Sequence, residues 1–236
     1  MIIETHVVAG LVALAAGGGA LAVKKGGGTH RRSGWFFVAA MVAMTSTAVI
    51  VATGPRPNPG NVIAGLLTLY LVITGATALR QSLPATQGWH VGLALAVAAV
   101  AAAALALGLA ASQRQGGSID GIPAPAFFMF ACVGALAAIG DARLSFATVR
   151  APSQRVMRHL WRMGFALWIA TMSFFIGQAR HFPAALRESG LLAVPVLLVA
   201  GLVVYWLFRT WRRGRSVRRF PDAGQALHQS RSVGEA

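Results

Sequence analysis

The chain has 236 residues, of which 56% are hydrophobic and only 11% are charged. Soluble domains carry about 25% charged residues, so this composition excludes a water-soluble globular protein. The net charge of +15 raises nucleic-acid binding as an explanation. However, the Lys and Arg residues fall between long apolar stretches rather than along one stripe. We therefore expect a membrane protein with basic loops and no nucleic-acid partner.

Seven segments are long and apolar enough to cross a bilayer, which takes about 20 residues as a helix. In chain order they are His6–Val23, Gly34–Thr53, Gly60–Leu79, Trp89–Ala111, Pro125–Phe146, Val156–Gln178 and Leu191–Leu207. Gly- and Pro-rich breakers lie between most of them. The single cysteine, Cys132, excludes an internal disulfide and cysteine-based metal clusters. The pattern predicts an all-α bundle of seven transmembrane helices.

The distribution of Lys and Arg predicts the orientation of this bundle. If the N-terminus is outside, 17 of the 21 basic residues lie on the cytoplasmic side. The four outer ones are Arg56, Arg114, Arg180 and Arg187. Such a bias is the signature of cytoplasmic loops. We expect a multi-pass protein of the inner (plasma) membrane with its N-terminus outside and its C-terminus in the cytoplasm.

Residues 1–211 are predicted to form the transmembrane domain, and residues 212–236 a basic, disordered cytoplasmic tail. The basic start of this tail is suited to anionic lipid headgroups as partners, beside the lipid bilayer itself. A homo-oligomer or a partner subunit in the membrane stays open.

Small residues predict which helix faces point inward, because they let helices approach closely in lipid. On the first helix they follow His6 at helical spacing, and on the sixth they follow His159 and Arg162. The inward stripe of the sixth helix is expected to consist of His159, Arg162, Ala166, Ala170, Ser173, Gly177 and His181, and its bulky face is expected to meet lipid. Hydroxyls of the second and third helices are expected to bond to helix carbonyls.

The histidines form two layers in this topology, His6 and His181 at the outer rim and His30, His90 and His159 at the inner rim. Imidazole is a ligand for haem iron and other metals, and helix bundles build such sites from facing helices. One hypothesis is haem b held by His6 with His181 and by His90 with His159, for electron transfer. A second is a metal centre of His30, His90, His159 and Asp141 that activates water. The competing interpretation is that each histidine is an interfacial residue bonded to backbone or lipid.

Asp141 is the only acid at the predicted inner rim, and it has a simpler role as the partner of Arg143, Arg158 or Arg162. Two other classes of function remain open beside the redox hypothesis. One is a carrier for small solutes or ions that uses the Ser- and Thr-containing helices. The other is an accessory or structural subunit with no site of its own. The sequence does not decide whether the protein is an enzyme.

Two stretches resemble a group of bacterial integral membrane proteins classed as a domain of unknown function. The first runs from His6 through a basic, glycine-rich turn to His30-Arg31-Arg32-Ser33-Gly34. The second runs from His159-Leu160-Trp161-Arg162-Met163 to Ser173-Phe174-Phe175-x-Gly177-Gln178. The resemblance implies an integral membrane protein in which His6, His30 and His159 are functional positions. The layout of this group is similar to that of di-haem membrane cytochromes.

Overall fold

The computed structural model describes residues 1–79, 87–145 and 152–219. Seven long helices account for most of this part of the chain: α1 (Ile2–Ala22), α2 (Gly28–Ala52), α3 (Pro59–Thr77), α4 (Gln87–Ser112), α5 (Ala124–Ser145), α6 (Pro152–Phe175) and α8 (Ala193–Arg219). The short elements are β1 (Ser118–Ile119), β2 (Ile122–Pro123), the 3-10 turn η2 (Ala179–His181) and α7 (Ala184–Glu188). Each predicted segment therefore contains one long helix, and the expected all-helical architecture is confirmed.

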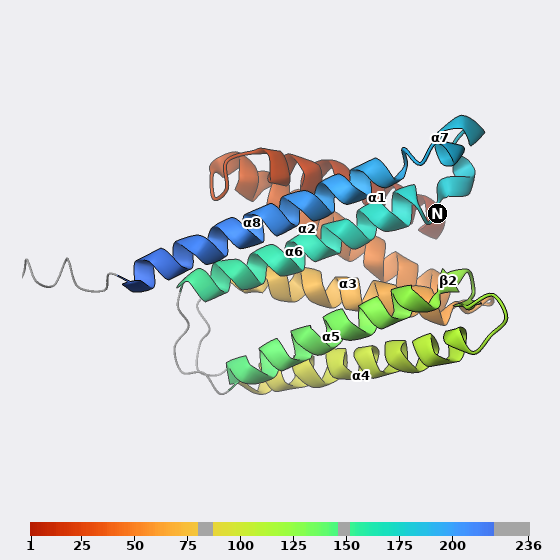
Figure 1. Ribbon diagram of the computed structural model, residues 1–236, viewed down its shortest axis with the longest axis horizontal. Helices are drawn as coiled ribbons and strands as arrows, with labels where there is room; N and C mark the ends of the chain where they lie inside the picture. Colours follow the sequence, from red (N-terminus) through yellow and green to blue (C-terminus); the bar gives the residue numbers. More distant parts are fainter. Residues whose placement is uncertain (80–86, 146–151, 220–236) are drawn as a thin grey trace, which may run out of the picture.

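The long helices run side by side along one axis, and successive ones run in opposite directions (Figure 1). The first residue lies at the end of the bundle that also holds α7, and α8 finishes at the opposite end. Two helices are central. Helix α3 packs on α2, α4, α5 and α6, whereas α6 packs on α1, α3 and α8.

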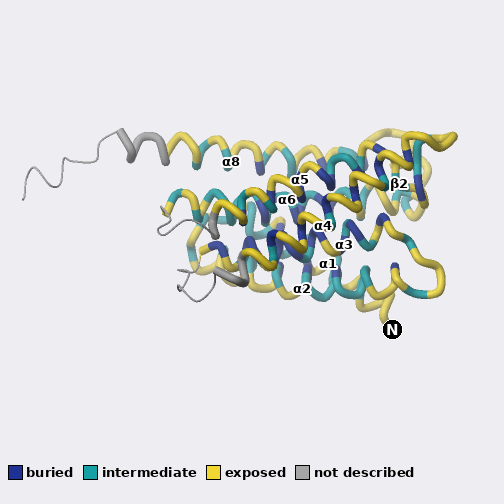
Figure 2. The backbone as a smooth tube through the Cα atoms, turned by 90° about the horizontal axis from the view of Figure 1, so that it is seen from below, coloured by how far each residue is buried: buried dark blue, intermediate teal, exposed yellow. Residues whose placement is uncertain are grey.

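Six of the long helices in the described part of the chain have the length and apolarity of membrane spans: α1, α2, α3, α4, α5 and α8. Their outer surfaces are apolar, with exposed side chains such as Trp35, Leu95 and Leu197. Figure 2 shows exposed positions along every one of these helices and buried positions where helices face one another. Large apolar side chains on the outside of a bundle are stable in lipid and costly in water. The chain is therefore a multi-pass membrane protein.

Helix α6 differs from the other six because its first half carries Arg155, Arg158, His159 and Arg162. The predicted inward stripe is right at its centre, where Arg162, Ala166 and Ala170 are buried. It is wrong at its end, since α6 stops at Phe175 and Ser173, Gly177 and His181 are exposed. The bulky face is half-buried rather than open to lipid, because α6 lies between α3 and α8 and neighbours cover both of its faces.

Close approach of the helices depends on glycines at their crossings. A Cβ added at Gly17 of α1 would lie 2.6 Å from Leu167 Cδ1 and 3.0 Å from Phe37 Cδ2. One at Gly164 of α6 would lie 2.7 Å from Val203 Cγ2 of α8. The first helix therefore presents the face that its small residues predict, with Ala13 and Gly17 buried. These contacts follow the rule that small residues let membrane helices meet.

The buried hydroxyls mostly bond within their own helices. Thr45 Oγ1 donates to the Met41 carbonyl at 2.7 Å, and Thr74 Oγ1 donates to the Tyr70 carbonyl at 2.6 Å. Thr171 Oγ1 donates to the Leu167 carbonyl at 2.8 Å. This agrees with the expectation for α2 and α3, and it leaves these hydroxyls committed to helix carbonyls.

Two of the connections between helices contain well-defined local structure. Lys25 caps the C-terminal end of α1, because its Nζ donates to the carbonyls of Ala20, Leu21 and Val23 at 3.1, 2.5 and 3.2 Å. Burial lowers the pKa of Lys25, which lies between α1 and α2. Asp120 and Gly121 both have positive φ, and they form the two-residue turn between β1 and β2.

The predicted tail begins as helix, since α8 continues to Arg219, and residues 220–236 lie outside the described part of the chain. The basic residues Arg209 and Arg212 of α8 lie over the rings of Trp206 and Phe208. Aromatic and basic side chains gather in this way at membrane–water interfaces.

We predict that Gly17→Leu destabilises the protein, whereas Gly18→Leu does not. The added side chain at Gly17 meets Leu167 and Phe37, and overpacking of this kind costs about 1–3 kcal/mol. A Cβ at Gly18 meets nothing within 4 Å. Thermal unfolding of the two variants in detergent tests this, and equal melting temperatures would contradict the close packing of α1 against α2 and α6.

Candidate functional site

Four polar side chains meet inside the bundle, about one turn from the end of α5. They are Tyr70 of α3, Asp141 of α5, and Arg158 and Arg162 of α6. Asp141 and Arg162 are 0% and 1% exposed, and the Arg158 side chain is 11% exposed. We call these four residues the charged cluster. Ionisable groups at such a place are costly unless they are paired.

Asp141 is the centre of the cluster and accepts from three side chains. Its Oδ1 lies 2.6 Å from Arg158 Nη2 and 2.7 Å from Arg162 Nη2. The Tyr70 hydroxyl donates to its Oδ2. Such charge-assisted bonds are stronger than bonds between neutral groups. One carboxylate therefore joins α3, α5 and α6.

Arg162 is held on several sides. Its Nη2 also donates to the Ala137 carbonyl at 3.3 Å, and its Nη1 lies 3.4 Å from the Tyr70 hydroxyl. The guanidinium carbon lies 5.2 Å from the centre of the Tyr70 ring. Gly75 of α3 makes room for this arrangement, because a Cβ there would lie 3.1 Å from Arg162 Cβ.

The contacts of Arg158 are fewer. Its Nη2 pairs with Asp141, but its Nε and Nη1 are buried without a hydrogen-bond partner among the described residues. The Nε of Arg162 is likewise buried without a hydrogen-bond partner among the described residues. The cluster thus combines one carboxylate with two guanidinium groups, and several of its N–H donors are unused.

The charged cluster also adds a direct link between α5 and α6. Helix α5 packs mainly against α4, and its main chain approaches α6 at few points. The long arginine side chains bridge this separation and reach the Asp141 carboxylate. Removing one partner from a buried ion pair costs about 3–5 kcal/mol, because an uncompensated charge remains.

Sequence reasoning finds part of this site. The predicted partners of Asp141 are Arg143, Arg158 or Arg162, and the ion pairs with Arg158 and Arg162 confirm the prediction. Arg143 is exposed. Sequence reasoning misses Tyr70, because it reads as one more apolar position of the third helix. Both tyrosines of the chain lie in predicted spans, and the position of Tyr70 near the middle of its span is the signal that could have found it.

Three of the described histidines, His6, His30 and His159, contact carbonyls of other helices. His159 Nδ1 lies 2.9 Å from the Gly75 carbonyl, and His30 Nδ1 lies 3.1 Å from the Ala20 carbonyl. His6 Nδ1 lies 2.9 Å from the Met44 carbonyl. Since a carbonyl only accepts, each Nδ1 carries the proton, and the Nε2 of a neutral ring keeps its lone pair.

The two predicted layers are partly brought together. His30, near the start of α2, and His159, in the first half of α6, lie toward the same end of the bundle (Figure 1). His181 is exposed in η2, and its Nε2 accepts from Arg180 Nε at 3.2 Å. His6 and η2 lie at the same end of the bundle (Figure 1), but no hydrogen bond joins the His6 and His181 rings. His90 belongs to α4, and its side chain lies outside the described part.

No three side chains of the metal-ligating types come together among the residues that the structure describes. Of the proposed set of His30, His90, His159 and Asp141, the side chain of His90 lies outside the described part. The other three, His30, His159 and Asp141, do not form a ligand group. Asp141 is engaged by the two arginines, which compete with a metal for its oxygens.

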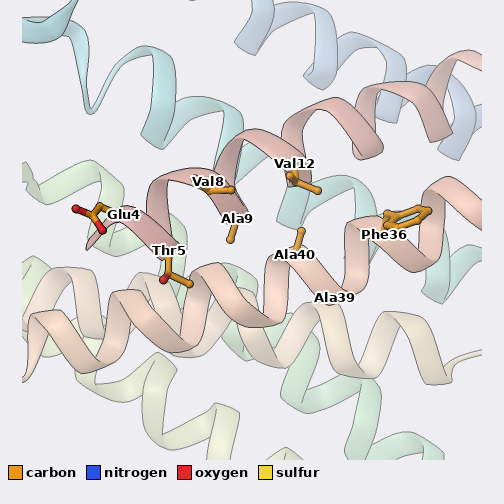
Figure 3. Close-up of a pocket in the computed structure, with 8 residues that line it drawn as sticks. All are labelled: Glu4, Thr5, Val8, Ala9, Val12, Phe36, Ala39 and Ala40. Carbon is orange, nitrogen blue, oxygen red and sulfur yellow. The ribbon is translucent and has the colours of Figure 1, made fainter. Parts of the chain in front are cut away.

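An apolar groove of about 490 Å³ lies between α1 and α2 (Figure 3). Its walls include Val8, Val12, Phe36 and Ala40, and the first three of these are exposed on the outside of the bundle. None of the described histidines lines it. Its chemistry suits lipid chains, and it is separate from the charged cluster.

Comparison of the chain with protein-family models, with curated proteins and with solved structures finds no match. The resemblance carried by the sequence motifs therefore stays a prediction. The class of protein is set by the fold and the site themselves: a multi-pass helical membrane protein with a buried charged cluster.

We predict that Asp141→Asn is far more destabilising than Arg158→Gln. The first change leaves two buried guanidinium groups without a counter-charge, at a cost of about 3–5 kcal/mol. The second leaves the neutral pair of Asp141 and Arg162 intact. Unfolding of both variants in detergent measures the difference, and an equal loss from the two would contradict an excess of positive charge in the cluster.

Proposed function

We propose that the chain crosses the bacterial inner membrane seven times, with its N-terminus outside and its C-terminus in the cytoplasm. Helix α6, the sixth long helix in chain order, is the span that this proposal adds to the six apolar ones. Its 24 residues give a length of about 36 Å, enough for the hydrocarbon core. Its polar groups turn toward α3 and α5, where Asp141, Tyr70 and the Gly75 carbonyl receive them. Pairing inside the bundle is the usual way for a span to carry such groups.

A reporter fused after Ala236 tests this topology. We expect alkaline phosphatase there to be inactive and a cytoplasmic fluorescent reporter to be bright. The matched fusion in the loop after Arg56 should show the reverse behaviour, because this topology puts that loop outside. A periplasmic signal at Ala236 would contradict the combination of seven spans with an outside N-terminus.

We further propose that the protein is a carrier for a small charged solute, with the charged cluster as its working centre. The observation that supports this is the burial of Asp141 and Arg162 at the junction of three helices. In membrane bundles, ionisable groups that face the interior mark pathways for ions and substrates. Asp141 of α5 pairs with two arginines of α6. When a solute replaces one of these ion pairs, α6 can move against α5.

Uptake by liposomes tests the carrier proposal. The purified protein should accumulate a labelled solute from a panel of inorganic anions, carboxylates and cations, and Arg158→Gln should lower the rate at least tenfold. Arg143→Gln is the matched control, because Arg143 is an exposed arginine on the same half of the bundle. Absence of uptake for every solute, or equal rates for the two variants, would contradict the proposal.

The second candidate is metal or haem b binding at the inner histidines. It is supported by His30 and His159, whose Nδ1 contacts leave both Nε2 atoms free to bind a metal. His90 is the proposed third member. The outer pair fits haem less well, because Arg180 engages the Nε2 of His181. Bound haem would supply a redox couple, and the histidines would hold and orient it.

Absorbance of the purified protein decides this candidate. Binding predicts a Soret band, or a stoichiometric metal by elemental analysis, that is lost in His159→Ala and kept in His228→Ala. A colourless, metal-free preparation would contradict it. If uptake is absent as well, the accessory subunit is the function that remains.

A further inference from the structure

The charged cluster holds one more positive charge than negative charge. Asp141 faces both Arg158 and Arg162, and Tyr70 is a neutral donor. The sequence contains six acids: Glu4, Asp120, Asp141, Glu188, Asp222 and Glu235. Glu4, Asp120 and Glu188 belong to the opposite end of the bundle, at the start of α1, in the turn before β2 and in α7. Asp222 and Glu235 lie outside the described residues.

The unused donors are on the same two arginines. Arg158 Nε and Nη1 and Arg162 Nε are buried without hydrogen-bond partners among the described residues. A buried donor that lacks a partner is costly, and more so when it is charged. Among the residues that the structure describes, the two arginines therefore lack a second negative charge and acceptor atoms, and an oxyanion has both.

The helix dipoles do not remove this deficit. The C-terminal ends of α3 and α5 lie at the same end of the bundle as the start of α6 (Figure 1), and each favours nearby cations. That effect is small compared with the penalty for a buried, uncompensated ion, so the dipoles offset only a part of the penalty.

We propose that Arg158 binds a small oxyanion of the carboxylate or phosphate class. Asp141 then remains with Arg162 as one neutral pair, and Arg158 forms a second neutral pair with the anion. Arg158 is the arginine suited to this exchange, because its side chain is more exposed than that of Arg162 and has fewer contacts. This deepens the carrier proposal by naming the class of solute, although binding itself is independent of transport.

The same chemistry is available from two sources. Arg158 lies six residues after the start of α6 at Pro152, which places it about 9 Å along the helix. That depth is within reach of a free anion from the aqueous side and of a phospholipid phosphate. Guanidinium groups bind both in the same way.

The test measures anion binding by the full-length protein in a phosphate-free maltoside detergent. Inorganic phosphate and acetate are titrated at constant ionic strength, with chloride as the balancing ion, and the melting temperature is followed. A ligand that binds only the folded state raises the melting temperature in proportion to the logarithm of its concentration above Kd. We expect this response in the natural chain and in Arg143→Gln, and an apparent affinity at least tenfold weaker in Arg158→Gln.

Arg158→Lys is the second variant, because it keeps the charge and loses the planar donor set. An intermediate affinity is expected for it, and it keeps the test decisive if the glutamine variant folds poorly. To separate the sources, a short-chain phosphatidic acid replaces phosphate in the same micelles. An Arg158-dependent response to the lipid alone assigns the site to a headgroup, and a response to free phosphate or acetate assigns it to a soluble anion.

The proposal is overturned if no oxyanion stabilises the protein, or if the natural chain and Arg158→Gln respond equally. Binding without uptake by liposomes would contradict the carrier proposal and leave the anion site in place. Uptake that depends on Arg158, combined with no oxyanion binding, would contradict the anion site alone.

Discussion

The fold depends on one buried carboxylate that faces two buried guanidinium groups. Asp141 receives Arg158 and Arg162 from α6 and the hydroxyl of Tyr70 from α3. In lipid there is no hydrophobic drive between helices, so packing and polar contacts must hold them together. The remaining helix contacts depend on small residues at the crossings, and the α4–α5 pair is joined to α6 through this carboxylate.

Helix α6 combines the roles of scaffold and site. Gly164 lets α8 approach, and Gly17 of α1 makes room for Leu167 of α6. Its polar groups, which would be costly in lipid, turn toward acceptors on α3 and α5. Because Asp141 binds two arginines, one pairing can be given up while the other remains. In the proposed carrier function, exchange of one of these pairings is the change through which a binding event moves a helix.

The sequence predicts the fold well and the site in part, for physical reasons. A long apolar run has one stable form in a bilayer, so six of the long helices follow from hydropathy, and the small-residue face of α1 follows from helical spacing. The pairing of Asp141 is predictable because it is the only acid at the predicted inner rim, where several arginines lie. The contribution of Tyr70, and the covering of both faces of α6, depend on which helices are neighbours, and a single sequence does not contain that information. Similarly, the carbonyl partners of His6, His30 and His159 are set by helix register.

A double-mutant cycle between Asp141 and Arg162 tests the central claim most directly. The free energy of unfolding in detergent is measured for Asp141→Asn, Arg162→Gln, the double variant and the natural chain. If these charges compensate each other inside the bundle, Arg162→Gln restores stability to Asp141→Asn, with a coupling energy of about 0.5–3 kcal/mol or more. If the two losses simply add, the carboxylate and the guanidinium do not interact, and the charged cluster is not what holds α5 to α6.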